Sequence, residues 1–256
     1  MEFLFPSTYE DSRARFRVDF ERIRPQWTDS RLESHPLQAD PTLSIDYAWA
    51  EPSKKQNLII VSTGLHGIEG YVGSAMLKLF MDEFVPRLDP ENTGLLLVHA
   101  INAYGMKHHR RYNENNVDLN RNFIWDEVFD PQVNLDYEPL RPMLNPERPI
   151  ANLFASDAAF VSRLVGSIVR LGILRIRQGM LSGQYRHPRG VQFGGQATQE
   201  GTRLMRELFD QAFERYEQII HLDMHTGYGP RYQMSMVNSS REPASGPELV
   251  QRFQYP

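Results

Sequence analysis

The feature that most constrains the fold is a pair of nearly continuous apolar runs. The first begins at Leu58, and the second spans residues 95–101. Between them, apolar residues recur at helical spacing from Gly70 to about Val85, and Pro86 follows. Strands that are buried on both faces and joined by a helix are typical of parallel sheets. The pattern therefore predicts an α/β fold.

The same periodicities predict the other elements. Expected helices span residues 8–24, 151–177, 198–217 and 247–253. Expected strands span residues 43–49, as an edge strand paired with the run at Leu58, and residues 218–225 and 232–237. Residues 124–150, rich in proline, should form a long ordered loop. We therefore expect one domain over residues 1–256, a three-layer αβα structure around a mixed, mainly parallel twisted sheet.

Composition excludes several classes of function. With 41 % hydrophobic and 23 % charged residues, the chain has the usage of an ordinary folded domain. A net charge of −4 offers no general attraction to nucleic acids or anionic membranes, so neither is an expected partner. The chain has no cysteine, so any metal must take nitrogen and oxygen ligands. An acidic start without a signal peptide predicts a cytoplasmic protein, of unknown oligomeric state.

The first apolar run ends in glycine and leads to two side chains that can bind a metal. His66 and Glu69 are three residues apart, and residues at this spacing share a face where the chain turns helical. Such a pair is also compatible with a plain capped turn, because zinc needs a third protein ligand. The metal interpretation therefore depends on a later segment.

A third ligand is predicted from the strand near residue 220. Its period of two places His221, Asp223 and His225 on one face. In a strand the two histidines lie about 13 Å apart, so one ion cannot bind both. A helical segment would instead bring them together in a different zinc geometry, but the alternation favours the strand. Ligands bind beyond the carboxyl ends of the strands in open α/β sheets, so we expect His225 to meet the first pair there.

The polar segment after the second apolar run, residues 110–123, is rich in Arg and Asn. Alone it reads as a solvated basic loop. A guanidinium, however, suits bidentate capture of a carboxylate, and a second one can stabilise an oxyanion. An acidic side chain can accept the second N–H of a ligand imidazole. Beside a metal, this segment would suit a substrate with a free carboxylate.

Three motifs resemble the zinc carboxypeptidase superfamily, which includes murein-peptide amidases and the succinylglutamate desuccinylase/aspartoacylase branch. They are His66-Gly-Ile-Glu69, Val117-Asp-Leu-Asn-Arg-Asn-Phe123 and Asp223-Met-His225-Thr-Gly. The resemblance covers roughly residues 40–235 and is nearest to a carboxypeptidase-like bacterial branch. It implies that His66, Glu69 and His225 ligate one zinc ion and that Asp118 orients His66.

The resemblance also implies roles toward the substrate. Asn120 and Arg121 would hold the terminal carboxylate, and Arg111 would polarise the scissile carbonyl. The expected activity is zinc-dependent hydrolysis of an amide or peptide bond next to a free carboxylate, on a small peptide. The alternatives are an N-acyl amino acid deacylase of the aspartoacylase type and a zinc- or carboxylate-binding protein without turnover.

Two departures from the family pattern stand out. Ile68 replaces an arginine that many carboxypeptidases carry between the first two ligands. The family's general base is a glutamate on a late strand, and neither Glu242 nor Glu248 stands in a matching motif. We therefore expect the general base beyond Pro256, and the chain to lack the last strand and helix of the fold.

Overall fold

The computed structural model describes residues 4–146, 151–231, 233–237 and 243–254. The chain divides into two compact units, Met1–His225 and Thr226–Pro256. None of the helices in the described ranges combines the length and the apolar character needed to cross a bilayer.

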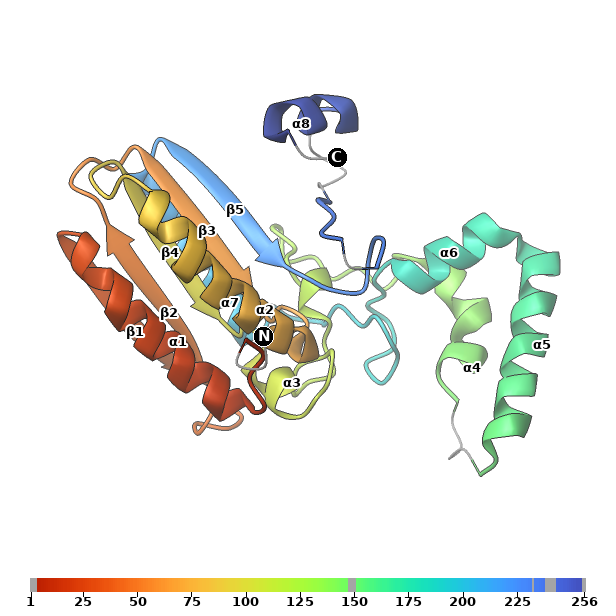
Figure 1. The fold of residues 1–256 in the computed structure, drawn as a ribbon. Coiled ribbons are helices and arrows are strands. Elements are labelled where there is room, and N and C mark those ends of the chain that lie inside the picture. The colour runs from red at the N-terminus through yellow and green to blue at the C-terminus, as the bar shows by residue number, and fades with distance from the viewer. Residues whose placement is uncertain (1–3, 147–150, 232, 238–242, 255–256) are drawn as a thin grey trace. The chain divides into compact units, whose positions relative to one another are not determined.

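A five-stranded mixed sheet with the strand order β1-β2-β4-β3-β5 lies at the centre of the first unit (Figure 1). Its strands are β1 (Asp29–Pro36), β2 (Ser44–Glu51), β3 (Asn57–Thr63), β4 (Thr93–His99) and β5 (Gln218–Met224). Strand β3 runs parallel to both β4 and β5, whereas β2 is antiparallel to both β1 and β4. The carboxyl ends of β3, β4 and β5 therefore meet at one edge of the sheet.

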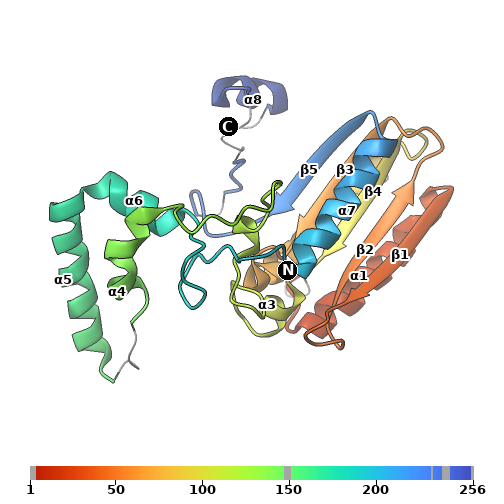
Figure 2. The ribbon, with the colours of Figure 1, turned by 180° about the vertical axis from the view of Figure 1, so that it is seen from behind.

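Helices cover both faces of the sheet, which confirms the expected αβα layers. One face carries α1 (Tyr9–Ile23) and α2 (Gly70–Leu79), and the other carries α7 (Glu200–Arg215), as Figures 1 and 2 show from opposite sides. The short helix α3 (Ala103–Lys107) follows β4.

The core explains why the two apolar runs are continuous. Val61 and Leu97 belong to the buried cluster that includes side chains of α1 and α2. Their neighbours Ile60 and Leu96 belong to the cluster that includes side chains of α7. Successive residues of a strand point to opposite faces, and here both faces are buried.

Two expected strands differ in the structure. Strand β2 is not an edge strand paired with the run at Leu58, because it lies between β1 and β4. The partner that covers it, β1, was not expected, since its sequence is mostly polar and its residues are mostly exposed or half-buried. Residues 233–237 form no strand, and Tyr232 lies outside the described residues.

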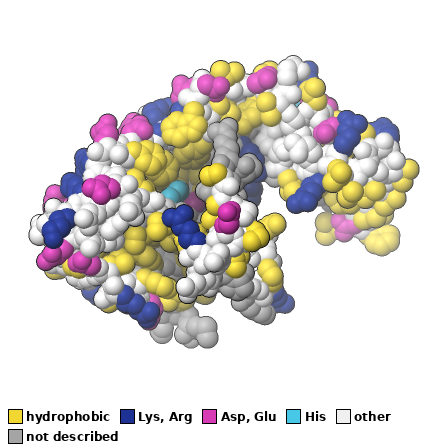
Figure 3. Space-filling model, turned by 90° about the horizontal axis from the view of Figure 1, so that it is seen from above, with side chains coloured by type: hydrophobic (Ala, Val, Ile, Leu, Met, Phe, Trp, Pro, Cys, Tyr) yellow, Lys and Arg dark blue, Asp and Glu magenta, His cyan; other side chains and the backbone are white. Residues whose placement is uncertain are grey.

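Residues 124–182 form an excursion from the sheet rather than a simple loop. Its elements are a 3₁₀ segment (Leu135–Leu140), α4 (Arg141–Leu144), α5 (Leu153–Leu171) and α6 (Ile173–Leu181); residues 147–150 lie outside the described ranges. The expected helix over 151–177 is interrupted at Gly172, which has a φ of 81°. A small core joins Leu140, Met143 and Ile176. Figure 3 shows hydrophobic side chains (yellow) at the surface of this part, where α5 has no buried residue among those described.

The second unit contains α8 (Gly246–Phe253), which confirms the helix expected over residues 247–253. It begins with a capping box, in which the Ser245 and Glu248 side chains satisfy backbone N–H groups of the first turn.

Candidate metal centre

The turn after β3 positions the first two candidate ligands. Gly64 has a φ of 67°, which glycine adopts readily, and a Cβ there would lie 3.0 Å from the Cα of Ala100. The 3₁₀ turn Gly67–Glu69 then leads directly into α2. His66 and Glu69 consequently lie together at the start of this helix, as their spacing predicted.

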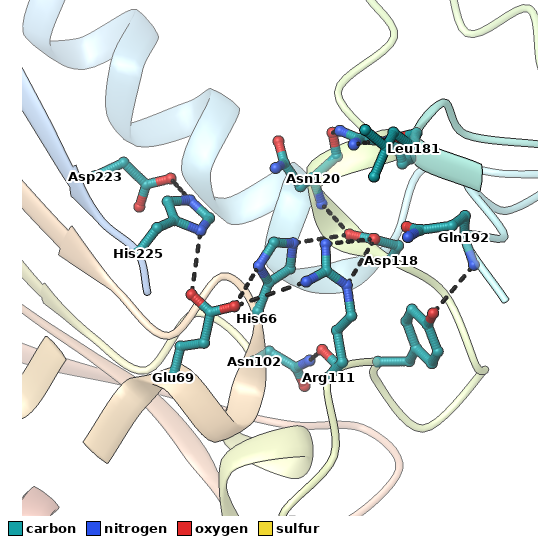
Figure 4. Close-up of polar contacts among 12 residues, drawn as sticks. His66, Glu69, Asn102, Arg111, Asp118, Asn120, Leu181, Gln192, Asp223 and His225 are labelled. Carbon is teal, nitrogen blue, oxygen red and sulfur yellow. Dashed lines mark hydrogen bonds and ion pairs between the residues drawn. The ribbon is translucent and has the colours of Figure 1, made fainter. Parts of the chain in front are cut away.

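The structure brings His66, Glu69 and His225 together, although the last two are 156 positions apart in the sequence. One ligand atom from each lies within 4.8 Å of the others. The Nδ1 atom of His66 lies 2.9 Å from Oε1 of Glu69, and Nδ1 of His225 lies 3.4 Å from Oε2 of the same carboxylate. Figure 4 shows both imidazoles turned toward Glu69.

Each imidazole is also held from behind by a second carboxylate. The Nε2 atom of His66 lies 3.2 Å from Oδ1 of Asp118, and Nε2 of His225 lies 2.6 Å from Oδ2 of Asp223 (Figure 4). In a neutral imidazole, an Nε2–H that donates to a carboxylate leaves the lone pair on Nδ1, the atom that faces Glu69. Both rings therefore turn Nδ1 toward the carboxylate of Glu69.

The charges of these groups favour a cation at that point. The hydrogen bond with Asp223, and then that with Glu69, raises the pKa of His225 to about 10. Burial by itself lowers the pKa of His66, but the hydrogen bonds with Asp118 and Glu69 outweigh it and the pKa is raised. Burial raises the pKa of Asp118 and of Asp223, yet the hydrogen bonds from the imidazoles prevail and both are lowered. The carboxylates thus stabilise positive charge on the two imidazole rings and in the space beside them.

The donor set fits zinc. Tetrahedral zinc with bonds of about 2.1 Å needs ligand atoms roughly 3.4 Å apart. The distances of 2.9 Å from Oε1 of Glu69 to Nδ1 of His66 and of 3.4 Å from Oε2 to Nδ1 of His225 are close to this spacing, and one ligand atom of each residue lies within 4.8 Å of the others. Two imidazoles and one carboxylate also match the catalytic type of site, which keeps a fourth position open.

Arg111 lies directly beside the candidate ligands. Its Nε and Nη2 atoms each lie 3.1 Å from Oδ2 of Asp118, and its Nη1 atom lies 3.7 Å from Oε1 of Glu69. Its backbone carbonyl accepts hydrogen bonds from Gly67 N and Asn102 Nδ2, each at 3.1 Å. The segment after β4 is therefore fixed against the turn after β3.

Asn120 and Arg121 lie on the same segment but differ in their contacts. The backbone N–H of Asn120 donates to Oδ1 of Asp118 at 3.1 Å, and its side chain is exposed. The Nη2 atom of Arg121 donates at 2.9 Å to the carbonyl of Leu181, at the end of α6. Its Nε atom is buried without a hydrogen-bond partner among the described residues. The guanidinium of Arg121 thus contacts the excursion.

Three other features singled out in the sequence are the alternative ligand His221, the two glutamates near the C-terminus and Ile68. His221 is a hydrogen-bond partner of Ser62 and does not belong to the ligand group found among the described residues. Glu242 lies outside the described residues, and Glu248 serves the capping box of α8. Ile68 lies at the surface, 45 % exposed.

Sequence reasoning missed Asp223 and Ser62 as parts of this centre. Asp223 shares a strand face with His225, and that alternation was the available signal. Ser62 gave no signal, because its contact with Asp223 depends on the register between β3 and β5.

Two solved structures are similar to this chain. The structure of bovine thrombin-activatable fibrinolysis inhibitor in complex with tick carboxypeptidase inhibitor aligns with a TM-score of 0.50 at 10 % identity, over 93 % of this chain and 68 % of that one. Carboxypeptidase A from Helicoverpa armigera aligns with a TM-score of 0.49 at 16 % identity, over 86 % of this chain and 46 % of that one. The similarity to the first of these structures confirms the expected α/β fold.

Sequence comparison places the chain in a defined family. No curated protein sequence matches it. The family model described as "Protein of unknown function (DUF2817)" matches residues 5–254, and the chain therefore belongs to this family.

Proposed function

We propose that the protein is a zinc-dependent hydrolase that cleaves an amide or peptide bond next to a free carboxylate, in the manner of metallocarboxypeptidases. The observation that carries the proposal is the convergence of the two Nδ1 atoms, of His66 and His225, on the carboxylate of Glu69. The carboxypeptidase-like fold supports it.

A zinc ion held by His66, Glu69 and His225 would supply Lewis-acid chemistry toward a carbonyl oxygen and would leave one position open. Besides contacting His66, Asp118 orients Arg111, because its Oδ2 atom accepts from Nε and Nη2 of that guanidinium. A guanidinium fixed in this way beside the ligands can donate to the oxygen that gains negative charge when a carbonyl is attacked. The side chain of Arg111 is 35 % exposed, so a substrate can reach it.

Asn120 and Arg121 are our candidates for the substrate carboxylate. Arg121 now donates to the neutral carbonyl of Leu181. A carboxylate would be a stronger acceptor, because hydrogen bonds between charged partners are roughly twice as strong as neutral ones. Binding would therefore shift the guanidinium from the excursion to the substrate.

The metal part of the proposal is tested by elemental analysis of the purified protein. We expect one zinc ion per chain, and none in the His225→Ala variant. The variant His108→Ala, which changes a surface histidine, should retain the metal. Absence of zinc and of other divalent metals from the wild type, even after incubation with zinc, would refute the proposal.

The substrate part is tested with matched pairs of small peptides, one with a free C-terminal carboxylate and one with a C-terminal amide. We expect hydrolysis of the free acid and strong discrimination against the amide. N-acyl amino acids form the comparison set for the alternative of an aspartoacylase-type deacylase. Zinc binding without hydrolysis in either set would favour a binding protein.

A further inference from the structure

A chain of four polar side chains runs across β3 and β5 behind the candidate metal centre. Ser62 of β3 is the register partner of Asp223 in the parallel strand β5. The Ser62 hydroxyl lies 2.7 Å from Oδ1 of Asp223 and 2.8 Å from Nε2 of His221. The other oxygen of Asp223, Oδ2, lies 2.6 Å from Nε2 of His225.

The hydrogen bonds among these four side chains have one consistent set of donors and acceptors. An ionised carboxylate only accepts, so Ser62 donates its single hydroxyl hydrogen to Asp223. The hydroxyl oxygen then accepts from Nε2–H of His221. Asp223 also accepts from Nε2–H of His225, so Nδ1 is the nitrogen of that ring that would give up its proton to a metal ion.

His225 needs this support more than His66 does. It follows the last residue of β5, and its side chain is 32 % exposed, against 5 % for that of His66. Neighbouring side chains therefore confine its ring less tightly. Ser62, by contrast, is fully buried within β3. The carboxylate of Asp223, which Ser62 holds in place, therefore restricts the orientation of the His225 ring.

We propose that Asp223 and Ser62 are positioning residues for zinc binding: Ser62 fixes the carboxylate of Asp223, and Asp223 fixes the ring of His225 with Nδ1 toward the ion. His221 contributes as the hydrogen-bond donor at the far end of the chain and is not a ligand. The inference rests on the proposed function only in requiring a metal at this centre.

The test measures the zinc dissociation constant of the full chain by competition with a chromogenic chelator. Asp223→Asn keeps the shape of the side chain but removes its charge, and we expect affinity to fall by about 10–100-fold, the usual effect of losing such a partner. Asp210→Asn is the matched control, since Asp210 is exposed on α7, and its affinity should equal that of the wild type. Wild-type affinity in Asp223→Asn would overturn the proposal.

A double-mutant cycle tests whether Ser62 acts through Asp223. Ser62→Ala should lower zinc affinity in the wild-type background but not in the Asp223→Asn background, because it acts through Asp223. An equal loss in both backgrounds would overturn that role. His221→Gln retains an N–H donor and should bind zinc like the wild type, whereas a loss as large as that of His225→Ala would identify His221 as a ligand and contradict the assignment.

Two further measurements separate this role from a general loss of structure. Thermal unfolding of the metal-free variants shows whether they are folded at the temperature of the titration, and a purely structural role would lower stability without lowering the zinc affinity of the folded form. The visible spectrum of the cobalt-substituted protein should change in Asp223→Asn but not in Asp210→Asn. A wild type that binds no metal would refute the proposed function, whereas tight binding by both wild type and Asp223→Asn would refute this inference alone.

Discussion

The Nε2 atom of His66 lies 3.2 Å from Oδ1 of Asp118, a carboxylate that is fully buried. Asp118 comes from the segment after β4, whereas His66 comes from the turn after β3. The contact therefore ties two neighbouring strand ends together at the candidate metal centre. Because Arg111 donates to the other oxygen of Asp118, one carboxylate orients both a candidate ligand and the guanidinium beside it.

Replacement of Asp118 by asparagine should weaken zinc binding while the protein remains folded. The amide has the same shape but no charge, so the ring of His66 loses the charged acceptor that favours its Nε2–H form. We expect zinc affinity to fall by about 10–100-fold in a chelator competition. Asp210→Asn again serves as the control, and an unchanged affinity in Asp118→Asn would contradict the role of this contact.

Replacement of Arg111 by lysine should separate catalysis from metal binding. Lysine keeps the positive charge but cannot form the paired Nε and Nη2 contacts that orient the guanidinium on Asp118. We expect kcat on the best peptide substrate to fall by about 10²–10³-fold, with zinc content unchanged. Arg110→Lys, at a guanidinium near the ring of Tyr104, is the matched control. Equal kcat values for the two variants would exclude Arg111 from the reaction.

Gly67 allows two backbone segments to touch beside the candidate ligands His66 and Glu69. A Cβ at Gly67 would lie 2.2 Å from the carbonyl carbon of Gly105 and 2.4 Å from the backbone N of Met106. Since backbone atoms cannot move aside easily, Gly67→Ala should destabilise the protein by about 3 kcal/mol and displace the turn that carries His66 and Glu69. Urea unfolding and zinc titration measure the two effects.

The control for Gly67 is Gly166, inside helix α5. A Cβ at Gly166 would meet nothing within 4 Å. Gly166→Ala should therefore stabilise the protein by about 0.5–1 kcal/mol, because alanine loses less backbone freedom in a helix. Similar unfolding free energies for the two variants would show that the close approach at Gly67 is unimportant.

Much of the fold and the ligand group could be predicted because they depend on local patterns. Strands β3 and β4 are buried on both faces, and their continuous apolar runs made that visible in the sequence. Parallel strands end at one edge, so His66, Glu69 and His225 could be expected to meet there. The polar strand β1 gave no such pattern, since its pairing with β2 uses backbone groups and its side chains are largely accessible.

The remaining features of the site depend on tertiary contacts that no periodicity records. The bond between Ser62 and Asp223 requires the register of β3 against β5. The contact of Arg121 with the carbonyl of Leu181 requires the fold of the whole excursion between them. Spacing along the chain indicates which face a side chain occupies, but not which partner it finds across a sheet or at the end of a distant helix.

A buried histidine away from the metal centre should make stability depend on pH. His99, the last residue of β4, is fully buried, and its Nε2 atom lies 2.7 Å from the hydroxyl of Ser12. Burial lowers the pKa of His99 to about 4. In the unfolded chain a histidine takes up a proton below about pH 6.5, whereas in the folded protein His99 stays neutral until about pH 4.

The sign of the effect follows from linkage. Above about pH 6.5 His99 is neutral in both states, so its full contribution to stability is present; as pH falls toward 4, the unfolded state gains the proton first and the free energy of unfolding decreases. A shift of this size corresponds to about 3 kcal/mol. Urea unfolding of the metal-free protein at about pH 7 and about pH 4.5 should therefore show a larger decrease for the wild type than for His99→Gln. His108→Gln, at a surface position, should retain the wild-type decrease, and a His99→Gln variant with the same decrease would contradict the prediction.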